Sequence, residues 1–200
     1  MIYRDREIYK EMLWKEFLQF KITPKQFECL WEKVRCIELK RGQVFSEEFS
    51  ICKRLGYLVF GELSAFGSDI NGKKTTSQFF YRPGNRVVTS FTSFNSEISS
   101  IESIKALSPC VLLFITFDDL KAVCHVEPCF HEIARKIGGR QLMISAIQIA
   151  ALKQLDATEQ IEALNNDHKI FFNVPFRSQL VSYTGIGRSN LISILKALGI

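Results

Sequence analysis

The sequence lacks several patterns that would place it in a specialised class of protein. Its six cysteines include no Cys-x-x-Cys pair, the spacing typical of zinc sites and thiol–disulfide enzymes. Its N-terminus alternates charged and apolar residues and so lacks the uninterrupted apolar core of a signal peptide. The longest strongly apolar run, residues 110–117, is far too short to cross a bilayer. We therefore expect a cytoplasmic protein that makes no contact with a membrane.

The cysteines also give little support to a metal or cofactor site. They are Cys29, Cys36, Cys52, Cys110, Cys124 and Cys129. Several lie among apolar neighbours, as in CVLLF, which is typical of buried thiols that pack as small apolar side chains. We expect neither a metal nor a cofactor, and a redox or iron–sulfur role is the alternative.

Residues with the chemistry of catalysis are scarce in the sequence. Cys124, His125 and Glu127 lie close together, but adjacent residues on a helix point in different directions. A working pair of nucleophile and base needs side chains within hydrogen-bonding reach of each other. We therefore expect no enzymatic activity.

Acidic residues are absent from the end of the chain. Residues 168–200 contain no Asp or Glu, although the whole chain has 21 of them. The formal net charge of the whole chain is +5. The basic residues of this segment are Lys169, Arg177, Arg188 and Lys196. An acid-free surface favours a polyanionic partner, because cationic side chains neutralise phosphates and release their counterions.

The first two thirds of the chain change from helical to strand-like periodicity. A chain of 200 residues that is 46% apolar fits one or two domains. Apolar residues at spacings of three and four predict two short helices within residues 3–33, separated at Thr23-Pro24. Short alternating segments then predict an antiparallel β-domain over 37–116, with turns at Arg41-Gly42, Asn71-Gly72 and Pro83-Gly84. The predicted strands are 37–39, 44–45, 57–66, 73–80, 86–88, 98–104 and 111–116.

A long helix is predicted from about Phe130 to Leu155, after a short helix that Asp118-Asp119 would cap and that ends before Pro128. The long helix has apolar residues on more than one side. One stripe is Ile133, Ile137, Ile144, Ile147 and Ala151, and the other is Leu142, Ile149, Leu152 and Leu155. A second stripe favours a parallel homodimer, and burial between two domains of one chain is the alternative.

The C-terminal segment has the pattern of a helix-turn-helix. A helix over DATEQIEALNNDH and the connection KIFFNVP precede helices at about 176–183 and 187–198, joined by a turn at Gly185. The predicted core is Leu180, Tyr183, Ile186, Leu191, Ile194, Leu195 and Leu198. The exposed side chains left over are Arg188, Ser189, Asn190, Ser193 and Lys196. Arg and Asn suit base readout and Lys suits phosphate, and we add Arg177 and Ser178 to this DNA-binding set.

With these parts in order, the chain resembles the Crp/Fnr family of bacterial transcription regulators over nearly its whole length. The matching segments are LKRGQVF with GYLVFGELSAF, NGKKTTSQFFYRPGNRV, IKALSPCVLLFI, DATEQIEAL and VPFRSQLVSYTGIGRSNLISILKAL. The resemblance implies an α+β chain with an N-terminal antiparallel, jelly-roll-like β-roll and flanking helices over 1–156, including a dimerisation helix at about 130–156. It also implies a helix-turn-helix domain over 157–200, in which Arg188 occupies a base-reading position.

The chain departs from this family at the positions that decide ligand and operator. The segment that resembles the cyclic-phosphate cassette, residues 89–101, has no arginine and contains Glu97, so we expect an effector other than cyclic AMP. The GELS sequence at Gly61 belongs to an earlier hairpin. Cys29 and Cys36 are too few for the iron–sulfur cluster of the oxygen-sensing branch, and His125 and His131 are the alternative haem ligands.

The sequence therefore predicts a homodimeric, sequence-specific DNA-binding transcription regulator. Its expected partners are double-stranded DNA and an unknown small-molecule effector, with RNA polymerase as a further candidate. Serines replace the acidic residue and second arginine that the family often has at positions 189 and 193. The alternative is a ligand-sensing or protein-interaction module whose degenerate helix-turn-helix no longer reads DNA.

Overall fold

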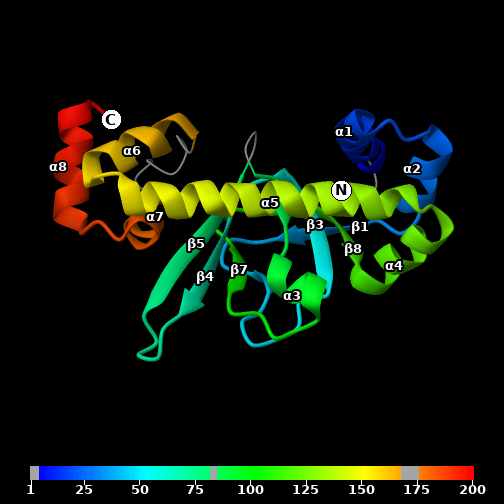
Figure 1. The fold of residues 1–200 in the computed structure, drawn as a ribbon, viewed down its shortest axis with the longest axis horizontal. Helices are drawn as coiled ribbons and strands as arrows, with labels where there is room; N and C mark the ends of the chain where they lie inside the picture. The colour runs from blue at the N-terminus through cyan, green and yellow to red at the C-terminus, as the bar shows by residue number, and fades with distance from the viewer. Residues whose placement is uncertain (1–4, 82–84, 168–175) are drawn as a thin grey trace. The chain divides into compact units, whose positions relative to one another are not determined.

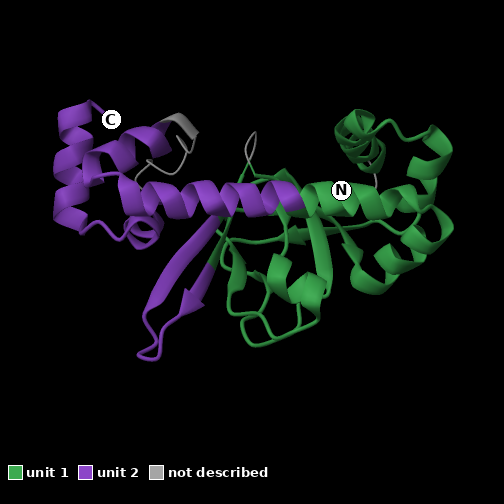
Figure 2. Ribbon diagram, viewed as in Figure 1, with its two compact units in different colours: residues 1–65, 79–138 green, residues 66–78, 139–200 purple. Residues whose placement is uncertain are grey.

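The computed structural model describes residues 5–81, 85–167 and 176–200 (Figure 1). The chain divides into two compact units, which Figure 2 distinguishes by colour. Unit 1 comprises residues 1–65 and 79–138, and unit 2 comprises residues 66–78 and 139–200. The sequence analysis predicts that the helix-turn-helix domain begins at residue 157. This domain boundary stays a prediction.

Two helices open the chain, as the sequence predicts. Helix α1 spans Arg6–Phe17 and is followed by the 3-10 turn η1 (Leu18–Phe20) and helix α2 (Pro24–Trp31). Thr23 caps α2 through a capping box: its Oγ1 accepts from the backbone N–H of Gln26, whose side chain accepts from the backbone N–H of Thr23. Proline at the first position of the helix costs no hydrogen bond, because that N–H has no partner in a helix.

The β-roll consists of two four-stranded sheets, ordered β1-β8-β3-β6 and β2-β7-β4-β5. The strands are β1 (Arg35–Leu39), β2 (Val44–Ser46), β3 (Arg54–Phe60), β4 (Leu63–Ser68), β5 (Lys74–Phe80), β6 (Val87–Val88), β7 (Ser103–Ala106) and β8 (Cys110–Thr116). Strand β8 pairs antiparallel with β1 and with β3 in the first sheet, and β2 pairs antiparallel with β7 in the second. The predicted α+β fold class is confirmed.

The single strand predicted over 57–66 is wrong, because the chain changes sheets in its middle. Strand β3 belongs to the first sheet and β4 to the second, and Gly61 lies between them with φ +90°. This conformation is disfavoured for residues that carry a Cβ. The long hairpin predicted from Tyr57 to Phe80 is therefore shorter, and β4 and β5 form it.

The tip of the β4–β5 hairpin differs from the predicted two-residue turn. Gly72 has φ +76°, but Asn71 is outside the positive-φ region. The N–H groups of Asn71 and Lys73 both donate to Asp69 Oδ1 at 2.8 Å, and the N–H of Gly72 donates to the carbonyl of Asp69 at 2.9 Å. A longer loop with glycine in the left-handed position therefore closes the hairpin.

The strand predicted over 98–104 is also largely wrong, because a helix precedes a shorter strand there. Helix α3 spans Phe91–Ser96, Glu97 follows it with φ +53°, and β7 begins only at Ser103. The Ser93 hydroxyl accepts from the N–H of Cys52 at 2.9 Å and donates to the carbonyl of Ile98 at 2.5 Å. These long-range bonds close a turn that local alternation does not reveal.

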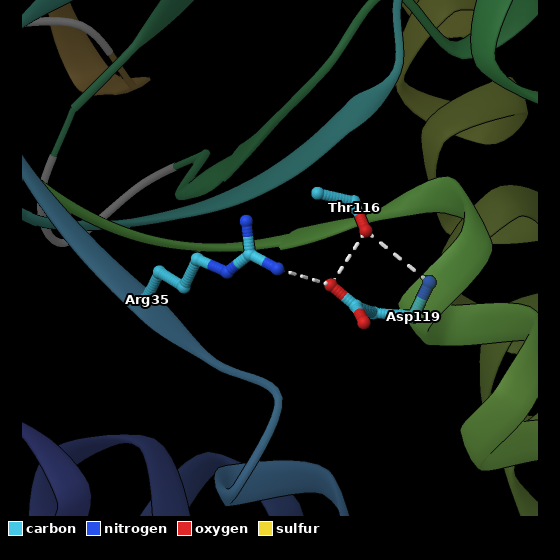
Figure 3. A network of polar contacts seen from close by, with 3 residues as sticks. All are labelled: Arg35, Thr116 and Asp119. Carbon is cyan, nitrogen blue, oxygen red and sulfur yellow. Dashed lines mark hydrogen bonds and ion pairs between the residues drawn. The ribbon is translucent and has the colours of Figure 1, made fainter.

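Helix α4 (Phe117–Val126) is capped by Thr116, so the prediction that Asp118-Asp119 cap it is wrong. Thr116 Oγ1 accepts from the N–H of Asp119 at 3.2 Å and donates to Asp119 Oδ2 at 2.6 Å (Figure 3). Arg35 Nη2 on β1 donates to the same carboxylate oxygen at 2.9 Å. This network ties an edge strand to the start of α4.

Two apolar clusters form the core of unit 1. One packs α1, α2, α4 and the start of α5 (Cys129–Gln154) on the outer face of the first sheet, and its buried members include Leu13, Phe27, Trp31, Leu113, Ile115, Phe130 and Ile133. The other fills the space between the two sheets and includes Phe45, Leu58, Leu63, Phe80, Ile104 and Leu112. Successive residues of β8 thus alternate between the two clusters.

Unit 2 contains a small helical cluster. After α5 come α6 (Ala157–Asp167), α7 (Arg177–Thr184) and α8 (Arg188–Leu198). The buried apolar residues are Ile161, Leu180, Ile186, Leu191, Ile194 and Leu195, with Ala157, Leu164, Val181 and Leu198 packed against them. The prediction is correct for these helices. Tyr183, however, was predicted to lie in this core, and Val181 packs there instead. The predicted segment KIFFNVP and turn Pro83-Gly84 lie outside the described residues.

None of the helices that the structure describes combines the length and the apolar character needed to span a bilayer.

Candidate nucleic-acid interface

The turn between α7 and α8 is fixed by a glycine and a threonine. Gly185 ends α7 with φ +73°, and its N–H donates to the carbonyl of Val181 at 3.0 Å. The buried Thr184 hydroxyl donates to the carbonyl of Leu180 at 2.9 Å and accepts from the N–H of Ile186 at 3.2 Å. The sequence analysis identified Gly185 but missed Thr184, although a hydroxyl residue at a helix end is a recognisable cap.

Helix α8 is anchored by one face and presents the opposite face to solvent. Leu191, Ile194 and Leu195 are buried against α6 and α7. Ser189, Ser193 and Lys196 are exposed, and their spacing of four and three residues aligns them in one stripe. Figure 1 shows α8 beside α6 at the C-terminal end of the chain.

Arg188 and Asn190 flank this stripe in the first turn of α8, and both are exposed. Gly187 precedes them and offers no side-chain cap, so the first N–H groups of the helix have no side-chain acceptor. Such a helix N-terminus favours phosphate, because its unpaired N–H groups and dipole both attract anions. Within the described part of the chain, neither Arg188 nor Lys196 forms an ion pair.

The other predicted site residues have more restricted positions. The Ser193 hydroxyl donates to the carbonyl of Ser189 at 3.1 Å, which leaves its oxygen as an acceptor only. Arg177 begins α7 and is half-buried, and Ser178 is exposed with its hydroxyl 2.9 Å from Gln179 Oε1. The structure therefore gathers five predicted residues on α8 and places two on the preceding helix.

A serine of α7 that the sequence analysis did not select joins this helix to the β4–β5 hairpin inside unit 2. Ser182 Oγ accepts from the N–H of Thr76 at 2.9 Å and donates to the carbonyl of Lys74 at 3.2 Å. Gln148 of α5 also donates to the carbonyl of Ser77 at 2.9 Å. Since β5 is an edge strand, the Ser182 hydroxyl pairs backbone groups of Lys74 and Thr76 on one side of this strand.

Replacing Ser182 by alanine is expected to lower the free energy of unfolding by about 1–3 kcal/mol, because the N–H of the buried Thr76 loses its acceptor. Urea denaturation measures this loss, and amide hydrogen exchange should accelerate at Thr76. Ser178→Ala is the matched control, since Ser178 is exposed on the same helix. Equal stabilities of the two variants would show that the Ser182 contact contributes nothing.

The structure also shows the surroundings of the residues considered for catalysis or haem binding. Cys124 is buried, and this burial, with the nearby Cys129 thiol, raises the pKa of Cys124, which disfavours the reactive thiolate. His125 is exposed, so the adjacent Cys124 and His125 face different environments, and the alternative haem ligand His131 is exposed as well. Among the described residues, no group of three His, Cys, Asp or Glu side chains is arranged to hold a metal ion.

The two predicted stripes of α5 have different surroundings. In the first stripe, Ile133 is buried, whereas Ile147 is exposed. In the second, Leu142, Ile149 and Leu152 are all exposed, and they repeat at spacings of seven and three residues. This is the heptad spacing of a helix that packs along a partner helix. We call these three residues the α5 seam.

The β-roll of two sheets, the long helix α5 and the C-terminal helices α6, α7 and α8 together define an architecture that can be compared with known structures. No protein-family model matches the sequence, and no curated protein matches it. Solved structures do match its fold. FixK2 from Bradyrhizobium japonicum aligns with a TM-score of 0.72 at 12% identity, covering 83% of this chain and 84% of FixK2.

Two further structures agree with this result. A putative regulator of the Crp/Fnr family from Eubacterium rectale aligns with a TM-score of 0.67 at 12% identity, covering 91% of this chain and 86% of its own. The regulator CLP from Xanthomonas campestris, described as responsive to c-di-GMP, aligns with a TM-score of 0.66 at 16% identity, covering 88% and 92%. The chain therefore has the Crp/Fnr fold, which confirms the sequence resemblance at the level of fold.

Proposed function

We propose that this chain is a sequence-specific, DNA-binding transcription regulator with α8 as its recognition helix. The observation that carries the proposal is the division of α8 into two faces. Leu191, Ile194 and Leu195 fix the helix to its domain, while the exposed side chains form the predicted DNA-binding set of polar and basic groups. Arg188 suits bidentate contact with guanine, Asn190 suits adenine and Lys196 suits phosphate.

The regulator acts as a homodimer through the α5 seam in this proposal. Exposed Leu142, Ile149 and Leu152 leave an apolar strip in water, and a second copy of the same helix would cover it. Two copies would present two recognition helices, so the operator should contain two half-sites related by two-fold symmetry. RNA polymerase is the further partner if the protein activates transcription.

The proposed effector is not cyclic AMP. The segment that resembles the cyclic-phosphate cassette, residues 89–101, has no arginine. Its buried hydroxyls bond to the chain itself: Ser93 links Cys52 to Ile98, and Thr89 Oγ1 donates to a backbone carbonyl of β3 at 2.9 Å. A cyclic phosphate would find no guanidinium partner within this segment, and the hydroxyls of Thr89 and Ser93 already donate to backbone carbonyls.

The proposal predicts different effects for two substitutions on α8. Arg188→Ala should weaken binding to the DNA upstream of the protein's own gene by about 1–3 kcal/mol, roughly 5–150-fold in Kd, with little change on a scrambled duplex. Lys196→Ala should weaken binding to both duplexes similarly and reduce the slope of log K against log salt by about one. Fluorescence anisotropy at several salt concentrations measures both effects.

Matched control variants in unit 1 distinguish the loss of a direct DNA contact from the effect of a lower net charge. Arg41→Ala and Lys33→Ala remove the same charges from exposed positions and should leave the preference for the upstream duplex unchanged. Equal affinity of the wild-type protein for upstream and scrambled DNA would contradict specific readout.

The alternative function, a protein-interaction module with a degenerate helix-turn-helix, is favoured by one observation. The Ser193 hydroxyl donates its proton within α8, so this position offers DNA only an acceptor. Absence of any DNA binding at low salt, together with stoichiometric recovery of a protein partner, would support the module instead.

A further inference from the structure

The interior of the β-roll is filled by side chains of the chain itself. Phe45, Leu58 and Phe80 are 0–1% exposed, so they border almost no space that a water molecule could occupy. A Cβ added to Gly56 would lie 3.1 Å from Phe45 Cζ and 3.3 Å from Leu112 Cδ2, which is tighter than ordinary van der Waals contact. The described part of the roll interior therefore leaves no room for a ligand beside these residues.

A cavity exists instead on the other face of the first sheet, wholly within unit 1. Its volume is about 100 Å³, and its walls come from α1, α2, α4, the start of α5 and the outward side chains of β3 and β8. Wall residues include Leu13, Phe17, Leu30, Leu113, Ile115 and Ile133. The described residues expose no polar atom to it. Voids larger than a water molecule are few in close-packed protein interiors.

The wall of the cavity determines the chemistry of an occupant. The ring of Tyr57 lines the cavity, but its hydroxyl accepts from Arg86 Nη1 at 2.8 Å. Arg86 also forms an ion pair with Glu16 at 2.7 Å. The polar groups beside the cavity are therefore satisfied, and a charged ligand would lose its hydration without gaining a partner. Apolar cavities of roughly this size stay dry and bind benzene or xenon.

The cavity adjoins the helix that carries the proposed dimer interface. Phe130, Ile133 and Ile137 of α5 form part of its wall. Ala134 also lines the cavity while being exposed to solvent, so the cavity reaches the surface beside this residue. Ile137 directly precedes the glycine pair 138–139, at which α5 passes from unit 1 into unit 2. An occupant would thus contact α5 immediately before its proposed dimerisation segment.

We propose that this cavity binds a small, uncharged, apolar molecule about the size of benzene and is the effector site of the regulator. This inference has two halves. The binding half, that the cavity holds such a molecule, depends on the cavity alone, and the effector half, that this molecule regulates DNA binding, rests on the proposed function. A ligand regulates only if it binds one conformation of the protein better than another. Filling the gap beside the first turns of α5 would favour the conformation in which those turns enclose and contact the occupant.

Benzene titrated into the full chain, with labelled isoleucine methyl groups, tests the binding half. Methyl chemical shifts of Ile115, Ile133 and Ile137 should move and saturate, whereas those of Ile104 in the roll interior and Ile186 in unit 2 should not. Shifts that rise linearly without saturation, or that appear equally at all five residues, would overturn the inference.

Two variants assign the binding to this cavity. Ala134→Leu places a larger apolar side chain at the exposed mouth and should weaken benzene binding at least tenfold without lowering the thermal midpoint. Ile137→Phe fills the wall from a second position and should act in the same direction. Ala163→Leu is the matched control, because Ala163 is exposed on α6 and does not line the cavity. Equal benzene affinity in all these variants would overturn the assignment.

The effector half is tested by measuring the Kd for the upstream duplex with and without saturating benzene. We expect at least a threefold change in wild type and in Ala163→Leu, and a smaller change in Ala134→Leu at the lowest benzene concentration that saturates wild type. Saturable binding with an unchanged Kd would overturn the effector role. A protein that binds benzene but never distinguishes upstream from scrambled DNA would contradict the proposed function and leave the binding site intact.

Discussion

Gly61→Ala is expected to lower the free energy of unfolding by about 3 kcal/mol or more, because two separate costs add at this position. The backbone has φ +90°, a conformation that costs a residue with a Cβ about 1–2 kcal/mol. The added Cβ would also lie 2.3 Å from the carbonyl oxygen of Pro109 and 2.7 Å from Cys110 Sγ. For a chain of this size, the thermal midpoint should fall by roughly 6–12 °C.

Gly42→Ala is the matched control for this prediction. Gly42 has nearly the same φ, +89°, but a Cβ there would have only Lys105 Cε nearby, at 3.7 Å. Its variant should therefore lose only the conformational part, about 1–2 kcal/mol. Chemical denaturation of both variants measures the difference, and equal losses would show that the approach of Pro109 to Gly61 costs nothing.

The same glycine shows what local sequence patterns can and cannot predict. Alternation over residues 57–66 correctly indicates strand, yet it does not reveal that β3 and β4 belong to different sheets. The break depends on the segment at Pro109, about fifty residues away, which approaches Gly61 closely. Helix α3 was missed for a related reason, since the Ser93 hydroxyl bonds to the N–H of Cys52, which lies 41 residues earlier in the segment before β3. Both errors concern contacts between distant segments.

The helical parts were predicted more completely because their signals are local. The break between the first two helices at Thr23-Pro24, the long periodic segment of α5 and the glycine turn before α8 all depend on residues close together in the sequence. In the candidate site, the buried face of α8 follows from periodicity, which is why Leu191, Ile194 and Leu195 were predicted correctly. That the remaining residues bind DNA stays a prediction.

Two features of the structure, one in each unit, could not be predicted from periodicity. Nothing in the sequence around Ser182 distinguishes it from an ordinary surface serine. Its hydrogen bonds exist only because the β4–β5 hairpin reaches α7. The apolar cavity is enclosed by side chains from several helices and strands, so no single segment reveals it. Tyr183 was assigned to the core by its apolar ring, but Val181 has the position that packs there.

Replacing Leu142 and Ile149 together by glutamate is expected to convert the proposed dimer to monomers and to weaken binding to the upstream duplex by about 10²–10⁴-fold. This range is the affinity that a second linked binding site typically adds. Leu142 is 74% exposed and Ile149 is 54% exposed in the single chain, so the substitutions should not unfold the monomer. Burying four like charges along a helix pair would instead destabilise the dimer.

The double variant Leu18→Glu with Ile70→Glu is the matched control, because it makes the same chemical change at two other exposed residues. Leu18 lies in η1, directly after α1, and Ile70 lies at the tip of the β4–β5 hairpin. This variant should remain dimeric and bind the duplex like wild type, apart from a small uniform loss from its added negative charge. Sedimentation equilibrium gives the oligomeric state of both proteins, and circular dichroism shows whether each is folded. A folded seam variant that stays dimeric would place the dimer interface elsewhere, whereas a monomer that still binds the upstream duplex with wild-type affinity would show that recognition needs only one copy of α8.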